Sequence, residues 1–217
     1  IKEGFVLLNG KICKKPAKEI ITGSSVSIVE QLQWVSRAGK KLFDALKSFE
    51  VEVEGKMALD VGSSTGGFTQ VLLYEGAEKI TSVDVGTDQL HSSLRSDARI
   101  SLLEQTDIRD ISSRLKDSFD LVVVDVAFIS LSKIINDIES VARKEGDIIL
   151  LYKPQFEVGK QNISKNGVVK KEADTQKILG HFLKSLEKSS LYFVKCRKAY
   201  ITGKKGNQEI FVHLKKC

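Results

Sequence analysis

The feature that most constrains the fold is a run of four consecutive aliphatic residues, Leu121 to Val124. A strand with one face in water alternates apolar and polar side chains, whereas a continuous apolar run indicates a strand buried on both faces. From residue 57 onward, strand-like segments alternate with helix-like segments. The alternation predicts an α/β fold with a mostly parallel sheet and helices on both of its faces.

The expected elements can be placed by residue range. Strands are expected at 57–61, 79–84, 100–104, 119–125, 146–152, 190–200 and 208–214. Helices are expected at 67–75, 87–95, 131–143 and 172–187, and a further helix is expected from residue 39, where one helical face carries Leu42, Phe43, Leu46 and Phe49. A turn from Gly203 to Asn207 joins the last two strands, so one strand should run antiparallel at or near an edge of the sheet.

Composition excludes several classes of protein. With 217 residues, 41% of them hydrophobic, the chain can bury a full core and is too apolar to be disordered. Its longest apolar runs are strand-sized, well below the roughly 18 residues of a membrane span, so an integral membrane protein is not expected. No signal-peptide pattern is found, so a signal peptide is not expected either. The three cysteines, Cys13, Cys196 and Cys217, form no CxxC or Cys/His cluster. We therefore expect no metal site, no disulfide framework and a reducing, cytoplasmic location.

Charge is distributed unevenly along the chain. Residues 1–50 hold nine basic and five acidic residues, residues 181–217 hold nine and two, and the middle has a net charge of −5. Basic ends around an acidic centre are expected when the ends contact a polyanion such as a nucleic acid. Solvated surface lysines are the alternative interpretation.

The first 30 residues form a separate β-rich segment. Residues 5–8 make a strand-like run that leads into Asn9-Gly10, a pair that favours a tight hairpin turn. The segment has too few apolar residues to fold on its own. We therefore expect two parts, residues 1–30 and residues 31–217.

The strongest local signal is a glycine-rich turn after the first long strand. Asp60 lies near the end of that strand, and the following turn and helix start contain Gly62, Ser63, Ser64, Thr65, Gly66, Gly67 and Phe68. Glycines let a ligand approach the backbone, and a helix N-terminus offers free N–H groups. The spacing is not the GxGxxG of nicotinamide and flavin enzymes, but an acid before a GxxxG turn is typical of S-adenosylmethionine-dependent methyltransferases. We expect these residues to bind that cofactor, with the Asp60 carboxylate holding the ammonium group of its methionine part.

Acidic residues also follow the next two strands. Asp84, followed by Val85, lies 24 residues after Asp60, near the spacing at which an acid binds ribose hydroxyls. Asp107 and Ile108 follow the third strand, where a carboxylate or an amide can meet the adenine. A helix cap is the alternative role for Asp107, and the sequence leaves both roles open.

Two charged residues, Asp125 and Lys153, end the fourth and fifth strands. Ligands bind at the carboxyl ends of the strands in this architecture. Pro154 keeps the preceding residue extended, which fixes the position of Lys153. Poor hydration at a strand mouth favours the neutral amine, the form that can act as a base. Asp125 is followed by Val126 and not by the Pro-Pro-Tyr of enzymes that methylate base amines, so a hydroxyl acceptor is favoured.

Together these motifs resemble the TlyA family, which are S4-domain plus FtsJ-like ribosomal RNA 2′-O-methyltransferases often labelled hemolysins. The resemblance covers residues 5–215. The segments that carry it are WVSRAGKKL at 34–42, the Gly62 loop, VDVG at 83–86, DVAFISL at 125–131, KPQFEVG at 153–159 and GNQE at 206–209. Ala38 stands where the family usually has the first glycine of Ser-Arg-Gly-Gly, a mild departure.

The resemblance implies an FtsJ-like catalytic tetrad of Lys41, Asp125, Lys153 and Glu209. The choice of Lys41 over Lys40 has a second, geometric argument. On the predicted helix, Lys40 projects opposite the apolar face and into solvent, whereas Lys41 lies at the border of that face and can reach a cleft.

The resemblance also implies the activity and the partners. Residues 5–29 match only the second half of the S4 RNA-binding domain. The expected reaction transfers a methyl group from S-adenosylmethionine to the ribose 2′-hydroxyl of a cytidine in ribosomal RNA, so ribosomal RNA or ribosomal subunits are the expected partners. Arg37, Lys40, Lys204 and Lys205 are expected to contact RNA phosphates. The alternatives are a membrane-active cytolysin, which no basic amphipathic helix or apolar span supports, and an RNA-binding module without catalysis.

Overall fold

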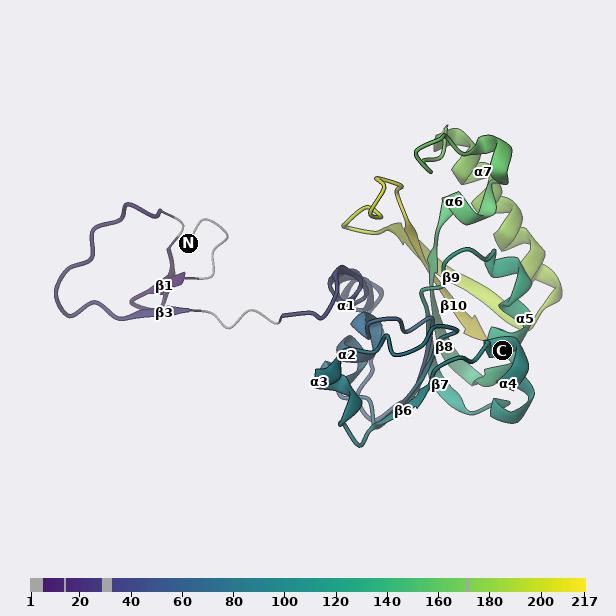
Figure 1. Cartoon of the computed structure of the whole chain (residues 1–217), viewed down its shortest axis with the longest axis horizontal. Helices are drawn as coiled ribbons and strands as arrows, with labels where there is room; N and C mark the ends of the chain where they lie inside the picture. The colour runs from purple at the N-terminus through teal and green to yellow at the C-terminus, as the bar shows by residue number, and fades with distance from the viewer. Residues whose placement is uncertain (1–5, 14, 29–32, 171) are drawn as a thin grey trace. The chain divides into compact units, whose positions relative to one another are not determined.

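The computed structural model describes residues 6–13, 15–28, 33–170 and 172–217, and the chain divides into two compact units, Ile1–Gln33 and Trp34–Cys217 (Figure 1). The domain boundary predicted after residue 30 falls within 29–32, outside the described residues.

The first unit contains a small antiparallel sheet with strand order β2-β1-β3. Its strands are β1 (Val6–Leu8), β2 (Lys11–Ile12) and β3 (Val26–Ile28). The predicted hairpin is confirmed: Asn9 and Gly10 connect β1 and β2 with positive φ angles of 51° and 75°. A two-residue turn of this hand matches the twist of the strands, and asparagine and glycine tolerate it best. The likeness of this segment to half of an S4 domain stays a prediction.

The second unit is built around a seven-stranded sheet with strand order β6-β5-β4-β7-β8-β10-β9. Its strands are β4 (Met57–Val61), β5 (Lys79–Val83), β6 (Ile100–Leu103), β7 (Phe119–Val124), β8 (Ala142–Tyr152), β9 (Leu191–Lys198) and β10 (Ile210–Lys216). Strands β4 to β8 pair in parallel, whereas β10 runs antiparallel to both β8 and β9. The predicted mostly parallel sheet with one antiparallel strand near an edge is confirmed.

Helices cover both faces of this sheet (Figure 1). On one side lie α1 (Arg37–Phe49), α2 (Gly67–Tyr74) and α3 (Ser92–Arg95), and on the other lie α4 (Ile108–Ile111), α5 (Ile135–Val141) and α7 (Glu172–Ser185). The single-turn helix α6 (Pro154–Glu157) follows β8. Short 3-10 turns are η1 (Ser112–Leu115), η2 (Leu131–Lys133), η3 (Lys160–Asn162) and η4 (Leu186–Lys188). Among the residues that the structure describes, no helix is long and apolar enough to cross a membrane.

The four aliphatic residues of β7 explain the two-sided core. Leu121 and Val123 pack with residues of α1 and α2, whereas Val122 and Val124 pack with residues of α4, α5 and α7. All four side chains are fully buried. Successive side chains of a strand point to opposite faces, so a central strand covered by helices on both faces must be apolar at every position.

The helix predicted over 87–95 is wrong in its first half. The carboxylate of Glu104 accepts hydrogen bonds from the backbone N–H groups of residues 88–90, at 2.9–3.3 Å. These bonds take the donors that a helix would use, so the segment is a loop until Ser92. The single-turn helices α4 and α6 were not predicted, because one turn has too few residues to show a period.

Candidate active site

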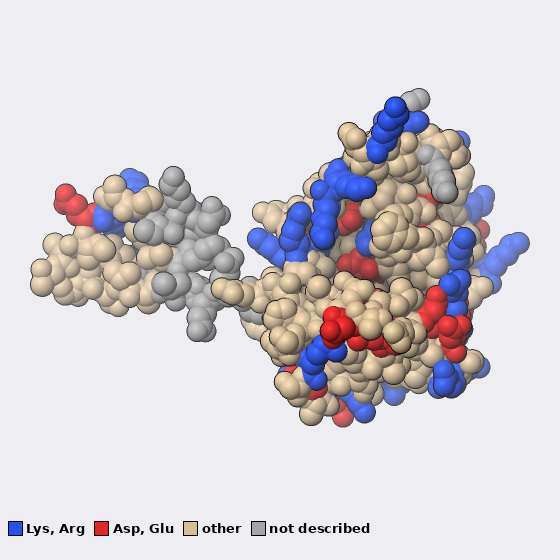
Figure 2. All heavy atoms as spheres, viewed as in Figure 1, with Lys and Arg blue, Asp and Glu red and all other residues tan. Residues whose placement is uncertain are grey.

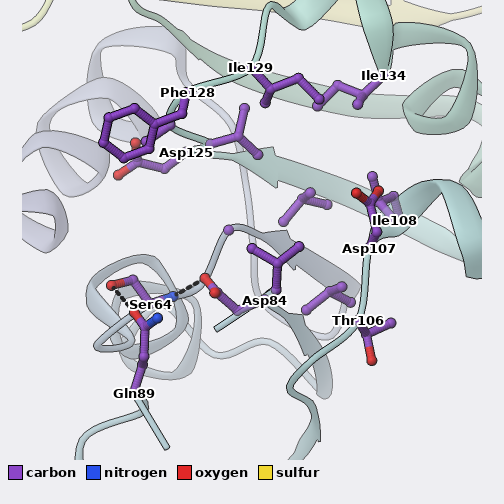
Figure 3. A pocket seen from close by; sticks show the side chains of 16 residues that line it. Ser64, Asp84, Gln89, Thr106, Asp107, Ile108, Asp125, Phe128, Ile129 and Ile134 are labelled. Atoms are coloured by element: carbon purple, nitrogen blue, oxygen red, sulfur yellow. Dashed lines mark hydrogen bonds between the residues drawn. The ribbon is translucent and has the colours of Figure 1, made fainter. Parts of the chain in front are cut away.

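A pocket of about 350 Å³ lies at the carboxyl ends of the central parallel strands (Figure 3). The residues that line it are Val61, Gly62, Ser64, Val83, Asp84, Val85, Gln89, Thr106, Asp107, Ile108, Asp125, Val126, Ala127, Phe128, Ile129 and Ile134. Seven of the predicted cofactor residues are therefore brought together, namely Gly62, Ser64, Asp84, Val85, Asp107, Ile108 and Asp125. In Figure 3, Ser64 and Asp84 face Asp125 and Phe128 across the pocket.

Gly62 forms the floor of this pocket between β4 and β7. Its φ is +83°, and a Cβ atom at this position would lie 2.8 Å from the backbone carbonyl oxygen of Asp125. Only glycine fits both the backbone conformation and the close approach. The glycine-rich turn and the segment that carries Asp125 are thus held in direct contact.

Asp60 lies beneath the turn and is fully buried, so it does not line the pocket. Thr69 Oγ1 donates a hydrogen bond of 2.6 Å to Asp60 Oδ2, and Oδ1 has no hydrogen-bond partner. Burial raises the pKa of Asp60 to about 7, although the bond from Thr69 opposes the shift. A buried carboxylate oxygen without a hydrogen-bond partner can accept a hydrogen bond or contact a cation.

Asp84 is held in place by backbone groups. Its Oδ2 accepts from the N–H of Ser64 at 2.8 Å, and its Oδ1 accepts from the N–H of Gly86 at 2.7 Å. Ser64 Oγ donates to Gln89 Oε1 at 3.0 Å, which brings Gln89 to the same wall (Figure 3). Sequence reasoning missed Gln89; the signal was Gly86, because a Cβ atom there would overlap the Gln89 amide.

Asp107 has the helix-cap role that the sequence left open, and its contact with the adenine stays a prediction. It caps α4, with its Oδ1 accepting from the N–H of Arg109 at 3.0 Å, and it also lines the pocket beside Ile108. A charge-assisted hydrogen bond from the Arg109 side chain lowers the pKa of Asp107, so this carboxylate is charged at neutral pH.

The other predicted cofactor residues shape the turn and do not line the pocket; they are Ser63, Thr65, Gly66, Gly67 and Phe68. Phe68 is buried and stacks on Phe211 in the core. A Cβ atom at Gly67 would overlap Ser36 Oγ, so Gly67 lets the starts of α1 and α2 pack together. Gly66 precedes α2 with a φ of +91°.

The predicted tetrad forms two ion pairs beside this pocket. Lys41 Nζ lies 2.5 Å from Glu209 Oε2, and Lys153 Nζ lies 2.7 Å from Asp125 Oδ1. Burial raises the pKa of Asp125; Lys153 and Lys41 oppose this shift and Glu209 adds to it, so the other three members of the tetrad all act on Asp125. Lys41 is buried while Lys40 is exposed, as the helical geometry predicted.

Further contacts hold the catalytic segments, and sequence reasoning missed them. The Glu157 carboxylate accepts from Ser130 Oγ at 2.6 Å and from the N–H of Leu131 at 2.9 Å, which joins α6 to the loop after β7. In that loop Phe128 has a φ of +65° and is 92% exposed, with its ring 5.3 Å from that of Phe156. The loop places Phe128, Ala127 and Ile129 in the lining of the pocket.

The four predicted RNA contacts lie on α1 and on the turn before β10. Arg37 Nη2 donates to the carbonyl oxygen of Thr202 at 3.0 Å, and Lys40 Nζ lies 6.0 Å from the ring centroid of Tyr200. Lys204 and Lys205 are exposed on the same turn. Figure 2 shows Lys and Arg side chains gathered around a hollow in which acidic side chains are visible.

The fold and this site define a class of protein. A parallel sheet with an antiparallel strand inserted beside its last edge strand, a glycine-rich turn after β4 and an acid after β5 are the arrangement of a class I methyltransferase. A methyltransferase structure from Mesorhizobium loti, named as S-adenosylmethionine-dependent, shares this fold with a TM-score of 0.59 at 15% identity, over 80% of this chain and 96% of that one.

Sequence comparison identifies the family. The FtsJ-like methyltransferase model matches residues 34–216, and the chain belongs to this family and, within it, to the TlyA group. The 23S rRNA (cytidine-2′-O)-methyltransferase TlyA of Campylobacter jejuni is 45% identical over 98% of this chain and 90% of its own length. A crystal structure from Lactococcus lactis, described as a hemolysin, has a TM-score of 0.81 at 38% identity and covers 86% of this chain and 90% of that one.

Proposed function

We propose that this chain transfers a methyl group from S-adenosylmethionine to the ribose 2′-hydroxyl of a cytidine in ribosomal RNA. The observation that carries the proposal is the pair of lysine–carboxylate contacts, Lys41–Glu209 and Lys153–Asp125, at the side of a nucleotide-sized pocket. Base-amine methylation needs no such cluster, whereas a hydroxyl must lose a proton as it reacts. A cytidine of ribosomal RNA is the substrate class in the name of the Campylobacter jejuni relative.

The pocket residues fit S-adenosylmethionine. The Asp84 carboxylate suits ribose hydroxyls, and Ile108 offers an apolar wall for a base. Asp60 does not line the pocket, but its oxygen without a hydrogen-bond partner suits a cation close to the glycine-rich turn. When bound, S-adenosylmethionine supplies an electrophilic methyl group on a sulfonium. Asp125 lines the pocket and faces the tetrad, so its carboxylate favours a positive charge at this point.

In the proposed reaction, Lys153 acts as the general base. Its Nζ takes the proton of the 2′-hydroxyl, and the ribose oxygen forms a bond to the methyl carbon as the carbon–sulfur bond breaks. Asp125 orients the amine of Lys153 through their 2.7 Å contact. Lys41, held by Glu209, orients the ribose. Positioning of the two reactants contributes the larger share of the rate.

Basic residues supply the RNA affinity in this proposal. Arg37, Lys40, Lys204 and Lys205 neutralise phosphates around the tetrad, and residues 1–30 act as an S4-like RNA-binding segment. Ribosomal RNA as substrate also places the enzyme in the cytoplasm.

The test is methyl transfer from labelled S-adenosylmethionine to ribosomal subunits of a strain that lacks this gene, followed by mapping of the modified nucleotide. We expect one or a few 2′-O-methylcytidines. Methylation of a base, or no label in ribosomal RNA with either subunit, would refute the proposal.

The cytolysin alternative is tested with the same preparation. Purified protein should leave dye-loaded vesicles of phosphatidylcholine and phosphatidylglycerol intact at concentrations that saturate methyl transfer. Leakage that rises with protein concentration and persists in Lys153→Ala would favour a membrane activity. RNA binding that Lys153→Ala retains, without methyl transfer in the unmodified protein, would favour a non-catalytic RNA-binding module.

A further inference from the structure

Tyr200 presents an aromatic ring to solvent between β9 and β10. It is 71% exposed, whereas Tyr152 in β8 is fully buried. The ammonium group of Lys40 lies 6.0 Å from the centroid of the Tyr200 ring. A ring with a cation beside it is a surface on which a flat, electron-rich group can stack. Neither the cofactor pocket nor the tetrad uses this ring.

Backbone and side-chain contacts fix Tyr200 relative to the catalytic residues. The N–H of Ala199, its neighbour in the chain, donates to the carbonyl oxygen of Glu209 at 2.8 Å. On the other side of Tyr200, the carbonyl oxygen of Thr202 accepts from Arg37 at 3.0 Å. The first turn of α1 therefore lies along the 199–209 segment, and the ion pair of Lys41 with Glu209 joins the same two segments.

The charges around Tyr200 suit a nucleic acid strand. The ammonium group of Lys40 lies over the ring, and Arg37 donates to the carbonyl oxygen of Thr202, two residues after Tyr200. Lys204 and Lys205 follow on the turn before β10. Aromatic rings interleaved with cations bind single-stranded nucleic acids, because bases stack on the rings while phosphates meet the cations. A base inside a duplex is already stacked on both faces and cannot use such a ring.

We propose that Tyr200, with Arg37 and Lys40, binds an unpaired nucleotide that flanks the methylated one. This inference rests on the proposed function, because it assumes an RNA substrate at the tetrad. It deepens that function by restricting the substrate to a segment in which a neighbour of the target nucleotide is unpaired. The stacking is tolerant of base identity, because every base has a π-face.

The test compares two probes of equal charge: an eight-residue oligocytidylate and an abasic ribose-phosphate oligomer of the same length. In the full chain, Tyr200→Ala should weaken binding of the oligocytidylate roughly tenfold and leave binding of the abasic oligomer unchanged. Tyr200→Phe should bind both probes as the unmodified protein does. Tyr192→Ala, which removes an exposed tyrosine from β9 (42% exposed), is the matched control and should change neither affinity.

An equal loss on both probes, or no loss on either, would overturn the stacking role of Tyr200, and so would a tenfold loss in Tyr192→Ala. Methyl transfer to ribosomal subunits is measured in parallel with the unmodified protein. Absence of methyl transfer would refute the proposed function. If methyl transfer is normal and Tyr200→Ala binds the oligocytidylate as tightly as the unmodified protein does, only the role of Tyr200 is refuted.

Discussion

Two clusters of ionisable side chains lie at opposite ends of the same sheet. The carboxyl-end cluster consists of Lys41, Asp125, Lys153 and Glu209. The amino-end cluster consists of Lys56, Asp147, His213 and Lys215. Strand β8 contributes Asp147 to one cluster and leads to Lys153 in the other, about 20 Å farther along the strand.

The clusters differ in how their carboxylates are compensated. Burial alone would raise the pKa of Asp147, but hydrogen bonds from His213 and Lys56 lower it to about 2. At the carboxyl end, burial outweighs the lysines, and the pKa of Asp125 is raised. Asp125 also lines the pocket, whereas no residue of the amino-end cluster does. An excess of donors therefore keeps the Asp147 carboxylate charged, whereas the Asp125 carboxylate beside the pocket has a raised pKa.

The largest expected effect separates the two clusters by activity. Lys153→Arg keeps the positive charge but cannot act as a base, so methyl transfer to ribosomal subunits should fall by a factor of about 10²–10⁴. Binding of S-adenosylmethionine, measured by calorimetry, should survive. Lys56→Arg, the matched change at the amino end, should leave kcat unchanged. Substantial turnover by Lys153→Arg would assign Lys153 a purely electrostatic role. The two clusters would then not differ in proton transfer.

The second prediction separates the clusters by stability. Asp147→Asn should lower the free energy of unfolding by about 2–3 kcal/mol, since it leaves Lys56 without its counter-charge and His213 without its carboxylate partner. Because the pKa of Asp147 is lowered in the folded state, its contribution is complete above about pH 4 and is lost as the pH falls toward 2. Urea unfolding of both proteins at pH 7 and pH 3 measures this. The difference between the two proteins should shrink at pH 3, and an equal difference at both values would contradict the assignment.

The third prediction concerns the cofactor side of the carboxyl end. Asp60→Ala should weaken binding of S-adenosylmethionine by about 1.5–3 kcal/mol, since it removes the buried negative charge beneath the glycine-rich turn. The pKa of Asp60 is raised to about 7, so its charge is present above this pH and lost below it. Affinity measured by calorimetry should therefore fall as the pH drops from 8 to 6. Asp60→Asn keeps the volume and should show a flat profile; a slope equal to that of the unmodified protein would exclude Asp60 as its source.

The smallest expected effect concerns the rim of the carboxyl end. Replacing Lys204 and Lys205 together by alanine should reduce the slope of log K against log salt for ribosomal RNA by about 1–2, because two phosphate contacts are lost. Lys79→Ala, an exposed lysine at the start of β5, is the control and should keep the slope. If the affinity of the unmodified protein for ribosomal RNA did not depend on salt, the basic ends of the chain would not be an RNA-binding surface.

The sheet and the positions of the site could be predicted because they depend on local pattern. The apolar run that contains Val122 required burial on both faces, and Pro154 fixed the end of β8 at Lys153. Parallel strands bring their carboxyl ends together, so Asp84 and Asp125 could be expected to meet at one edge.

The rest depends on contacts between distant residues, which no local pattern records. The Glu104 carboxylate accepts hydrogen bonds from backbone N–H groups of a loop more than ten residues earlier. The Glu157 carboxylate likewise accepts hydrogen bonds from residues 26–27 positions before it. The burial of Asp60 beneath the turn, away from the pocket wall, likewise follows from the packing of α2 on β4 and from the hydroxyl of Thr69.

The ion pair between α1 and the residue before β10 has a consequence for the synthesis of the protein. Lys41 and Glu209 are 168 residues apart in the chain, so their pairing closes a very long loop. During synthesis, β4 to β8 can emerge and pair before β10 exists, and such a nascent chain would have its cofactor pocket but not its tetrad. A nick between β9 and β10 would likewise spare the parallel strands and sever the link to Glu209. In the proposed mechanism, catalysis therefore requires the final strand to be in place.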